Sequence, residues 1–174
     1  MIEAGNTQYA QCNGLKIAYE SFGKPEDPAI VLVAGLYNQL VRWPLELCQL
    51  LVDRGFRVIR FDNRDCGLST KFDGIEVDLG AVLKAALLEE TVPPVPYTLS
   101  DMAGDVVGLL DFLKIDSAHI FGVSLGGMIA QVLTIEHPSR VRSLISVMSM
   151  SGEPEFGQST PEAIGALLSE SPSN

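Results

Sequence analysis

The sequence predicts an α/β protein with a mostly parallel sheet and helices on both of its faces. Three short runs indicate the parallel strands: 29–35, 56–62 and 118–124. Each is rich in Val, Ile or Phe and ends in a glycine or a polar turn, as buried parallel strands do. Segments with helical periodicity lie between them, and this alternation of strand and helix is typical of a parallel sheet.

Two strands and a helix are predicted in the first third of the chain. The strands are expected at 9–12 and 15–21, ahead of the first parallel strand. The helix is expected within 43–55, with Pro44 in its first turn and Gly55 at its C-terminal cap. Its apolar face is expected to consist of Leu47, Leu50 and Leu51.

The second half of the chain predicts two further helices and one more strand. In the segment 98–113, Thr98 and Asp101 stand at the spacing of a capping box. The buried face of that helix is expected to hold Met102, Val106, Leu109 and Leu110. A helix follows in 125–138, where a proline ends it, and a strand in 141–150.

Composition limits the classes of function. The chain has 174 residues, 47% of them hydrophobic and 20% charged, which suits one globular domain. A net charge of −10 leaves no basic surface for nucleic acid or an anionic membrane. Cys12, Cys48 and Cys66 lack metal-ligand spacing and no other ligand cluster is visible, so neither a metal nor a cofactor is expected. With no signal peptide or membrane span in the sequence, a cytoplasmic protein is expected.

Three turns with functional potential follow the ends of predicted parallel strands, at Gly35, Asp62 and Ser124. Ligand sites in such sheets lie beyond the carboxyl ends of the strands, so these turns are expected to meet at one rim. Residues 71–97 interrupt the alternation and contain an apolar, helix-like piece. This piece could fold over the rim or form a simple surface excursion.

Ser124 stands in a G-x-S-x-G pattern, with a strand directly before it and a helix directly after it. In this context Gly122 and Gly126 would relieve crowding at a sharp turn that exposes the serine hydroxyl. The N–H of Leu125, at the helix N-terminus, could then stabilise an oxyanion. The alternative is a glycine-rich turn that binds a phosphate or no ligand at all.

The stretches 33–44, 56–70 and 121–131 together resemble the α/β-hydrolase superfamily. Within it, they are most similar to the bacterial esterase branch that includes aclacinomycin methylesterase and proline-iminopeptidase-like proteins. The resemblance implies Ser124 as nucleophile and the backbone N–H groups of Leu36 and Leu125 as oxyanion donors. Ala34 stands where the family usually has a histidine.

Other residues of these stretches have structural alternatives. Asp62, Arg64 and Ser69 match the family turn after the fourth strand and are expected to form a structural cluster of hydrogen bonds and an ion pair. Substrate contacts are assigned to Gly35, Tyr37 and Trp43. Packing in the core or at the rim is an equally good reading of the two aromatic residues.

The base that should activate Ser124 is missing from these 174 residues. His137 lies 13 residues later along a predicted helix, about 20 Å away. His119 lies five residues earlier on a strand, about 16 Å away in the wrong direction. α/β-Hydrolases place the acid and the histidine after the serine in the chain. Since no suitably placed histidine follows Ser124, the acids that follow it have no histidine to orient.

The sequence therefore predicts the N-terminal part of a longer α/β-hydrolase, lacking the C-terminal strands that carry the acid and the histidine. Residues 1–150 are assigned to the core, with 71–97 as the excursion, and 151–174 to the start of a cap region in a truncated or nicked chain. The predicted function is hydrolysis of a small carboxylic ester through an acyl-enzyme. The alternatives are peptidase, thioesterase or acyltransferase activity, or a noncatalytic interaction subunit. A further partner would be the remainder of the same protein as a separate chain.

Overall fold

A computed structural model describes residues 2, 6–78, 81–82, 85, 91, 93–152, 160 and 162–163. Six strands form one sheet in the order β1-β2-β4-β3-β5-β6. They are β1 (Gln8–Cys12), β2 (Leu15–Phe22), β3 (Ala29–Val33), β4 (Arg57–Phe61), β5 (Ala118–Val123) and β6 (Val141–Val147). The pairs β1–β2 and β2–β4 are antiparallel, whereas β4, β3, β5 and β6 run parallel. The predicted α/β fold, with a mostly parallel sheet, is confirmed.

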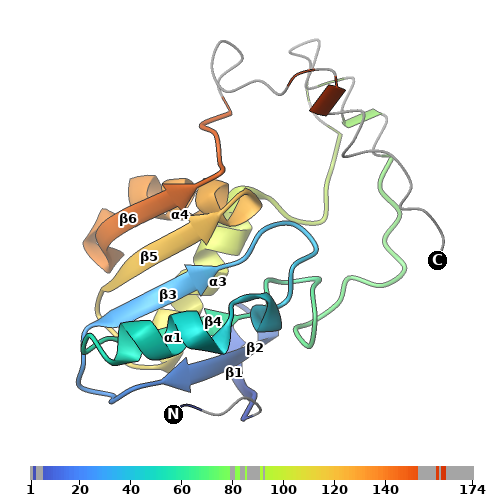
Figure 1. Ribbon diagram of the computed structural model, residues 1–174. Helices are drawn as coiled ribbons and strands as arrows, with labels where there is room; N and C mark the ends of the chain where they lie inside the picture. Colours follow the sequence, from blue (N-terminus) through green and yellow to red (C-terminus); the bar gives the residue numbers. More distant parts are fainter. Residues whose placement is uncertain are drawn as a thin grey trace, which may run out of the picture.

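Helices cover both faces of the sheet, as Figure 1 shows, with α1 in front and α3 and α4 behind. Their bounds are α1 (Leu45–Val52), α3 (Leu99–Phe112) and α4 (Leu125–Glu136), with short 3-10 turns η1 (Leu40–Arg42) and η2 (Pro138–Arg140). One apolar cluster lies on the α3 and α4 side and a smaller one on the α1 side. All five residues of β3 are buried because this central strand is covered from both sides.

The helix α3 follows the sequence prediction closely. Thr98 is its N-cap, and the capping box with Asp101 is complete in both directions. The four residues assigned to its buried face are all buried, and they pack against the sheet and α4. The box fixes where the helix begins, and the buried face fixes how it docks.

The prediction for α1 is wrong in two details. Pro44 is the N-cap and the helix begins at Leu45, so the proline precedes the first turn. Leu50 is 52% exposed, and Cys48 is the fully buried residue of the helix. At 100° per residue Leu50 lies about 200° around the helix from Cys48, on the side away from the sheet. The apolar face is centred on Cys48, with Leu47 and Leu51 beside it.

Two parts of the predicted organisation lie largely outside the described residues. Of the helix-like piece at 79–90, only 81, 82 and 85 are described, and of 151–174 only 151, 152, 160, 162 and 163. No helix in the described part of the chain combines the length and apolar character that a membrane span requires.

Candidate active site

The three turns predicted to share a rim do come together. β4, β3 and β5 are neighbours that run parallel, so the segments after their carboxyl ends lie at one edge. A Cβ atom added to Gly35 would lie 3.3 Å from Cβ of Ser124. The N–H of Leu40, a little beyond Gly35, donates to Oδ1 of Asp62 at 2.6 Å. The rim therefore brings Ser124 beside the loop that follows β3.

Ser124 has the backbone conformation of a sharp strand-to-helix turn. Its φ of 55° and ψ of −123° lie in a region that residues with side chains rarely adopt. Its own N–H donates to the carbonyl of Val147 at 2.9 Å, and its carbonyl accepts from the N–H of Gly127 at 2.8 Å. These bonds hold the turn in place. The side chain makes no capping hydrogen bond, and the residue is exposed.

The two glycines of the pattern are required by close backbone packing. A Cβ on Gly122 would lie closer than 3.0 Å to the carbonyl oxygen of Gly126. A Cβ on Gly126 would lie equally close to the carbonyl oxygen of Val33, on the neighbouring strand. The helix α4 can therefore begin directly against β3 and β5 only because both positions lack side chains.

The loop after β3 forms a tight turn beside Ser124. The N–H of Asn38 donates to the carbonyl of Gly35 at 3.1 Å, and Tyr37 has a positive φ of 58°. The Asn38 side chain closes the turn further by donating to the carbonyl of Leu36 at 3.2 Å. Within the described part of the chain, the N–H of Leu36 has no hydrogen-bond acceptor. The N–H of Leu125 opens α4 and has no intrahelical partner either.

Asp62 is committed to structure, as the sequence predicted. Its two carboxylate oxygens accept from the N–H groups of Leu40 and Leu68 at 2.6 and 2.7 Å. Ser69 donates to the carbonyl of Asp62 at 2.6 Å and accepts from the N–H of Ala18 at 2.9 Å. This cluster ties the loops after β3 and β4 to β2, and both carboxylate oxygens of Asp62 take part in it.

Arg64 belongs to the same loop but pairs with a residue that the sequence did not reveal. Its Nε and Nη2 donate to the two carboxylate oxygens of Asp105 on α3 at 2.6 and 2.7 Å. Burial alone would lower the pKa of Arg64, but the hydrogen bonds to Asp105 raise it above its ordinary value. The guanidinium also lies 5.8 Å from the ring of Phe72 and 5.4 Å from that of Tyr97. The loop is thus fastened to α3.

Two further elements of the site were missed by sequence reasoning. Arg60, on β4, is buried, donates to Glu20 on β2 at 2.6 Å and also donates to the carbonyl of Trp43. Asn63, in the turn after β4, donates from Nδ2 to the carbonyl of Ala34 at 3.0 Å. Both contacts join residues far apart in sequence. The only local signal was the position of Asn63 in a turn at the end of a strand.

Two cavities flank the loop at Gly35. The α1-side cavity has a volume of about 420 Å³. Its lining is Ala34, Gly35, Asn38, Arg42, Trp43, Pro44, Leu47, Val123, Ser124 and Met148. The α3-side cavity has a volume of about 290 Å³. Its lining is Gly35, Leu36, Tyr37, Asn63, Arg64, Asp65, Cys66, Tyr97, Thr98, Leu99, Met102 and Leu125.

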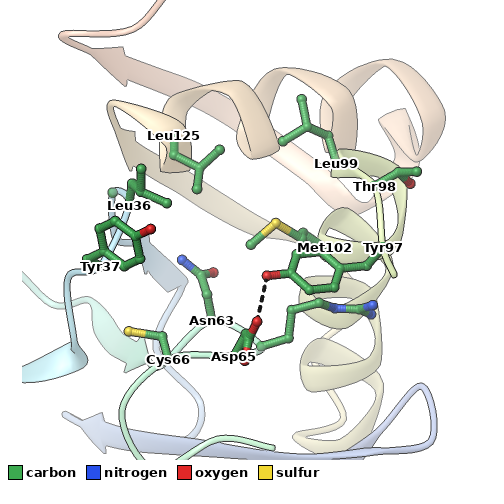
Figure 2. A pocket seen from close by; sticks show the side chains of 12 residues that line it. Leu36, Tyr37, Asn63, Asp65, Cys66, Tyr97, Thr98, Leu99, Met102 and Leu125 are labelled. Carbon is green, nitrogen blue, oxygen red and sulfur yellow. Dashed lines mark hydrogen bonds between the residues drawn. The ribbon is translucent and has the colours of Figure 1, made fainter. Parts of the chain in front are cut away.

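The residues predicted to contact substrate divide between these cavities. Gly35 lines both. Trp43 is only 8% exposed, lines the α1-side cavity and packs against the ring of Phe121 with 5.2 Å between ring centroids. Tyr37 is 90% exposed and lines the α3-side cavity (Figure 2). Ser124 faces the cavity of Trp43, and both proposed oxyanion donors line the cavity of Tyr37.

Two titratable side chains of the α3-side cavity, Tyr97 and Cys66, are held in their neutral forms. Burial and the hydrogen bond to Asp65, 3.0 Å long, raise the pKa of Tyr97 to about 12 (Figure 2). Burial raises the pKa of the Cys66 thiol, whose Sγ donates to the carbonyl of Asn38 at 3.3 Å. Neither group is an activated nucleophile at neutral pH.

Neither histidine of the chain lies near Ser124. Nδ1 of His119 is 2.8 Å from Oγ of Ser143, and its ring packs against Phe56. It pairs with Ile30 near the start of β3, at the opposite end of the sheet from Ser124. His137 is the C-cap of α4, and Ser124 is its N-cap. Within the described ranges, no group of three or more His, Cys, Asp or Glu side chains is placed to hold a metal ion.

The strained serine between β5 and α4, beside a turn with an unused N–H group, has the geometry of the strand-to-helix turn that is typical of α/β-hydrolase folds. The family model for the α/β hydrolase fold matches residues 28–171, and the chain belongs to this family.

Individual relatives agree with this assignment. Rhodomycin D methylesterase DnrP of Streptomyces peucetius is 31% identical over 137 residues, which are 79% of this chain and 40% of the methylesterase. A hydrolase from Pseudomonas aeruginosa PA01 is 30% identical, with a TM-score of 0.65 over 97% of this chain and 55% of that structure. The enol-lactonase from Burkholderia xenovorans LB400 is 32% identical, with a TM-score of 0.58 over 77% of this chain and 44% of the lactonase. The chain thus spans about half or less of the length of these relatives.

Proposed function

We propose that the protein is a carboxylic ester hydrolase that works through an acyl-enzyme on Ser124. The observation that carries this proposal is the strained, exposed Ser124 at the start of α4, held there by glycine contacts that no side chain could replace. A turn that served only to connect a strand and a helix would not need this conformation. The methylesterase and lactonase relatives support an ester as the substrate class.

In the proposed mechanism, Oγ of Ser124 attacks the ester carbonyl and expels the alcohol. The N–H groups of Leu36 and Leu125 stabilise the oxyanion of the tetrahedral intermediate. The ester spans the loop at Gly35, so that its two halves occupy the α1-side and α3-side cavities. Gly35, Tyr37 and Trp43 contact the substrate there.

The proton of Ser124 requires a base that neither histidine of this chain can supply. We therefore propose that the acid and the histidine come from residues outside these 174. Residues 1–150 would then form the N-terminal part of the core, and 151–174 would lead into a cap region. The additional length of the relatives is consistent with this division.

Covalent labelling tests the assignment of the nucleophile. The protein expressed from its complete reading frame is incubated with a fluorophosphonate and measured by intact-mass spectrometry. We expect one adduct on Ser124, with none in Ser124→Ala. Ser100→Ala, which alters an exposed serine bonded to Glu136, is the matched control and should label fully. Absence of an adduct in the unsubstituted, folded protein would favour a noncatalytic role.

The reaction class is tested separately. The unlabelled protein, from a preparation that reacts with the fluorophosphonate, is assayed with esters and thioesters of one acyl group and with prolyl amides. Transfer of the acyl group to added alcohols is monitored in parallel. We expect kcat/KM to be highest for the oxygen esters. A faster reaction with thioesters or amides would instead assign thioesterase or peptidase activity to the same fold.

A further inference from the structure

The side chain of Asn63 lines the α3-side cavity, and the protein fixes its orientation through the NH₂ group while leaving its amide oxygen without a partner in the described part of the chain. It is only 5% exposed. The carbonyl of Ala34 can only accept, so the NH₂ group of Asn63 must face it, across 3.0 Å. The amide oxygen is thereby turned away from the loop.

That oxygen has no hydrogen-bond partner among the described residues, yet it is open to the cavity. In the described part of the chain, the only buried side-chain polar atom without a partner is Nε1 of Trp43, so Oδ1 of Asn63 is not sealed off. Figure 2 shows the amide pointing into the space bounded by Leu36, Leu125 and Met102. A buried acceptor in this position is available to a ligand.

The other polar groups of the lining also favour a ligand that donates. Arg64 directs its donors to Asp105 and to the carbonyl of Asp101. The hydroxyl of Tyr97 donates to Asp65, and the thiol of Cys66 donates to Asn38. These side-chain donors are thus satisfied within the protein, the N–H groups of Leu36 and Leu125 are assigned to the oxyanion, and Oδ1 of Asn63 is left as an acceptor facing the cavity. Arg64 and Asp65 line the cavity with opposite formal charges, so neither sign of ligand charge is favoured and we take the complementary donor to be a neutral hydroxyl.

Part of the lining is apolar, and the volume of the cavity is small. Leu99, Met102 and Leu125 provide the walls, and about 290 Å³ accommodates roughly one ring-sized group. Both proposed oxyanion donors line the same cavity, so a group bound there can be part of an ester whose carbonyl lies at Ser124.

We propose that the α3-side cavity binds a hydroxyl-bearing, ring-sized part of the ester and that Oδ1 of Asn63 accepts the hydrogen bond from that hydroxyl. This proposal rests on the ester hydrolase function proposed above. It makes Asn63 a specificity-determining residue whose other contact, to Ala34, also positions the oxyanion loop.

The test compares matched esters. Methyl 3-phenylpropanoate is compared with its ortho-, meta- and para-hydroxyphenyl analogues and with the corresponding methoxy compounds, using the protein expressed from its complete reading frame. We expect at least one hydroxylated ester to exceed the unsubstituted ester in kcat/KM by about tenfold, the value of one neutral hydrogen bond. Its methoxy analogue, which cannot donate, should lose that advantage. If the kcat/KM ratio of the hydroxylated to the unsubstituted ester is near one for all three isomers, the proposal is overturned, and no variant is needed for this conclusion.

Two variants separate recognition from positioning. Asn63→Leu removes the acceptor and the contact to Ala34. It should therefore slow the hydrolysis of both esters and reduce the kcat/KM ratio of the hydroxylated to the unsubstituted ester to about one. Leu99→Ala, in the same cavity, should slow both esters while the preference persists. A preference that survives in Asn63→Leu contradicts the role of Asn63.

Binding distinguishes failure of this proposal from failure of the proposed function. In Ser124→Ala, calorimetry with the same esters should show the same tenfold preference, because binding does not require the nucleophile. If Ser124 is not labelled and this preference is nevertheless present, the ester hydrolase function fails and the hydroxyl site stands. If Ser124 is labelled and no preference for the hydroxylated ester is found, the ester hydrolase function stands and the hydroxyl site fails.

Discussion

At the scale of single residues, the site depends on backbone contacts that admit no side chain. The positive φ of Ser124 is maintained because α4 begins in direct contact with β3 and β5, through Gly122 and Gly126. The cost of the strained conformation, about 1–3 kcal/mol, is offset by the packing and hydrogen bonds around it. A side-chain atom added at either glycine should therefore lower the stability of the protein and also the reactivity of Ser124.

Gly126→Ala is expected to lower the free energy of unfolding by about 3 kcal/mol, because the added methyl group would collide with the backbone of Val33 and force α4 away from β3. Urea denaturation followed by circular dichroism measures this change. The same variant should also lose fluorophosphonate labelling at Ser124, even under conditions where it remains folded.

Gly104→Ala is the matched control. Gly104 lies inside α3, has no positive φ, and an added Cβ would meet only the end of the Asn13 side chain at 3.4 Å. Alanine there should be neutral or stabilise the protein by up to about 1 kcal/mol through helix propensity. If Gly104→Ala and Gly126→Ala lower the free energy of unfolding equally, the role assigned to the contact between Gly126 and Val33 is contradicted.

The residues of the site differ in how far the sequence could predict them. Ser124 and its glycines were predictable because the strand, the turn and the helix are consecutive in the chain. Asp105 and Asn63 were not, since their partners lie 41 and 29 residues away in sequence. Their contacts exist only once α3 and the loop after β3 have docked on the sheet. A local pattern carries no information on such pairings.

At the scale of elements, the start of α3 shows what a local pattern can specify. Thr98 and Asp101 exchange hydrogen bonds with each other's N–H groups, and the start of the helix follows from these two residues alone. The face of α1 was harder to predict. Leucine and cysteine compete for the buried position there, and the more apolar Leu50 is on the exposed side.

Thr98→Ala should destabilise the protein by about 1 kcal/mol at neutral pH, because it removes the side-chain half of the N-cap. The hydrogen bonds from Thr98 also lower the pKa of Asp101. The folded-state pKa of Asp101 is therefore below its unfolded value of about 3.9, so its stabilising effect is present above that pH and is lost as the pH falls through the folded-state pKa. The difference in stability between Thr98→Ala and the parent protein should shrink below about pH 4.

Urea denaturation between pH 3 and pH 7 checks this expectation, with Ser100→Ala as control. Ser100 lies in the same first turn but bonds to Glu136 on the surface instead of to the helix end. Its substitution should cost a few tenths of a kcal/mol. A loss in Thr98→Ala that stays constant down to pH 3 would show that Asp101 does not depend on Thr98.

At the scale of the whole molecule, the order of the strands decides where chemistry is possible. β4, β3 and β5 are consecutive neighbours in the sheet, although the chain forms them in the order β3, β4, β5, and this crossover places three loops at one rim. The alternation of strands and helices was enough to predict that rim. It could not predict the division of the rim into two cavities, because this depends on where Arg60, Asn63 and Arg64 anchor the loops.

β6 is an edge strand of the described sheet, and it is unusually open. The five residues between its ends are exposed, and Ile145 and Leu144 are 41% and 37% exposed. Met148, just beyond the strand, is 79% exposed. A seven-residue edge with apolar side chains and a single charge is a template for pairing with another chain. We therefore expect the 174-residue chain to self-associate through β6.

Ile145→Lys should suppress this association, because a charge on the edge strand must be desolvated when a second strand pairs with it. Static light scattering over a range of protein concentrations measures the effect, and the apparent mass should fall toward 18.8 kDa. Val41→Lys is the control: Val41 is 67% exposed and lies in η1, away from the edge. If both variants reduce the scattering equally, general apolar exposure and not strand pairing causes the association. If neither does, β6 is not the site, since a lysine at the centre of a paired edge could not be accommodated without loss of affinity.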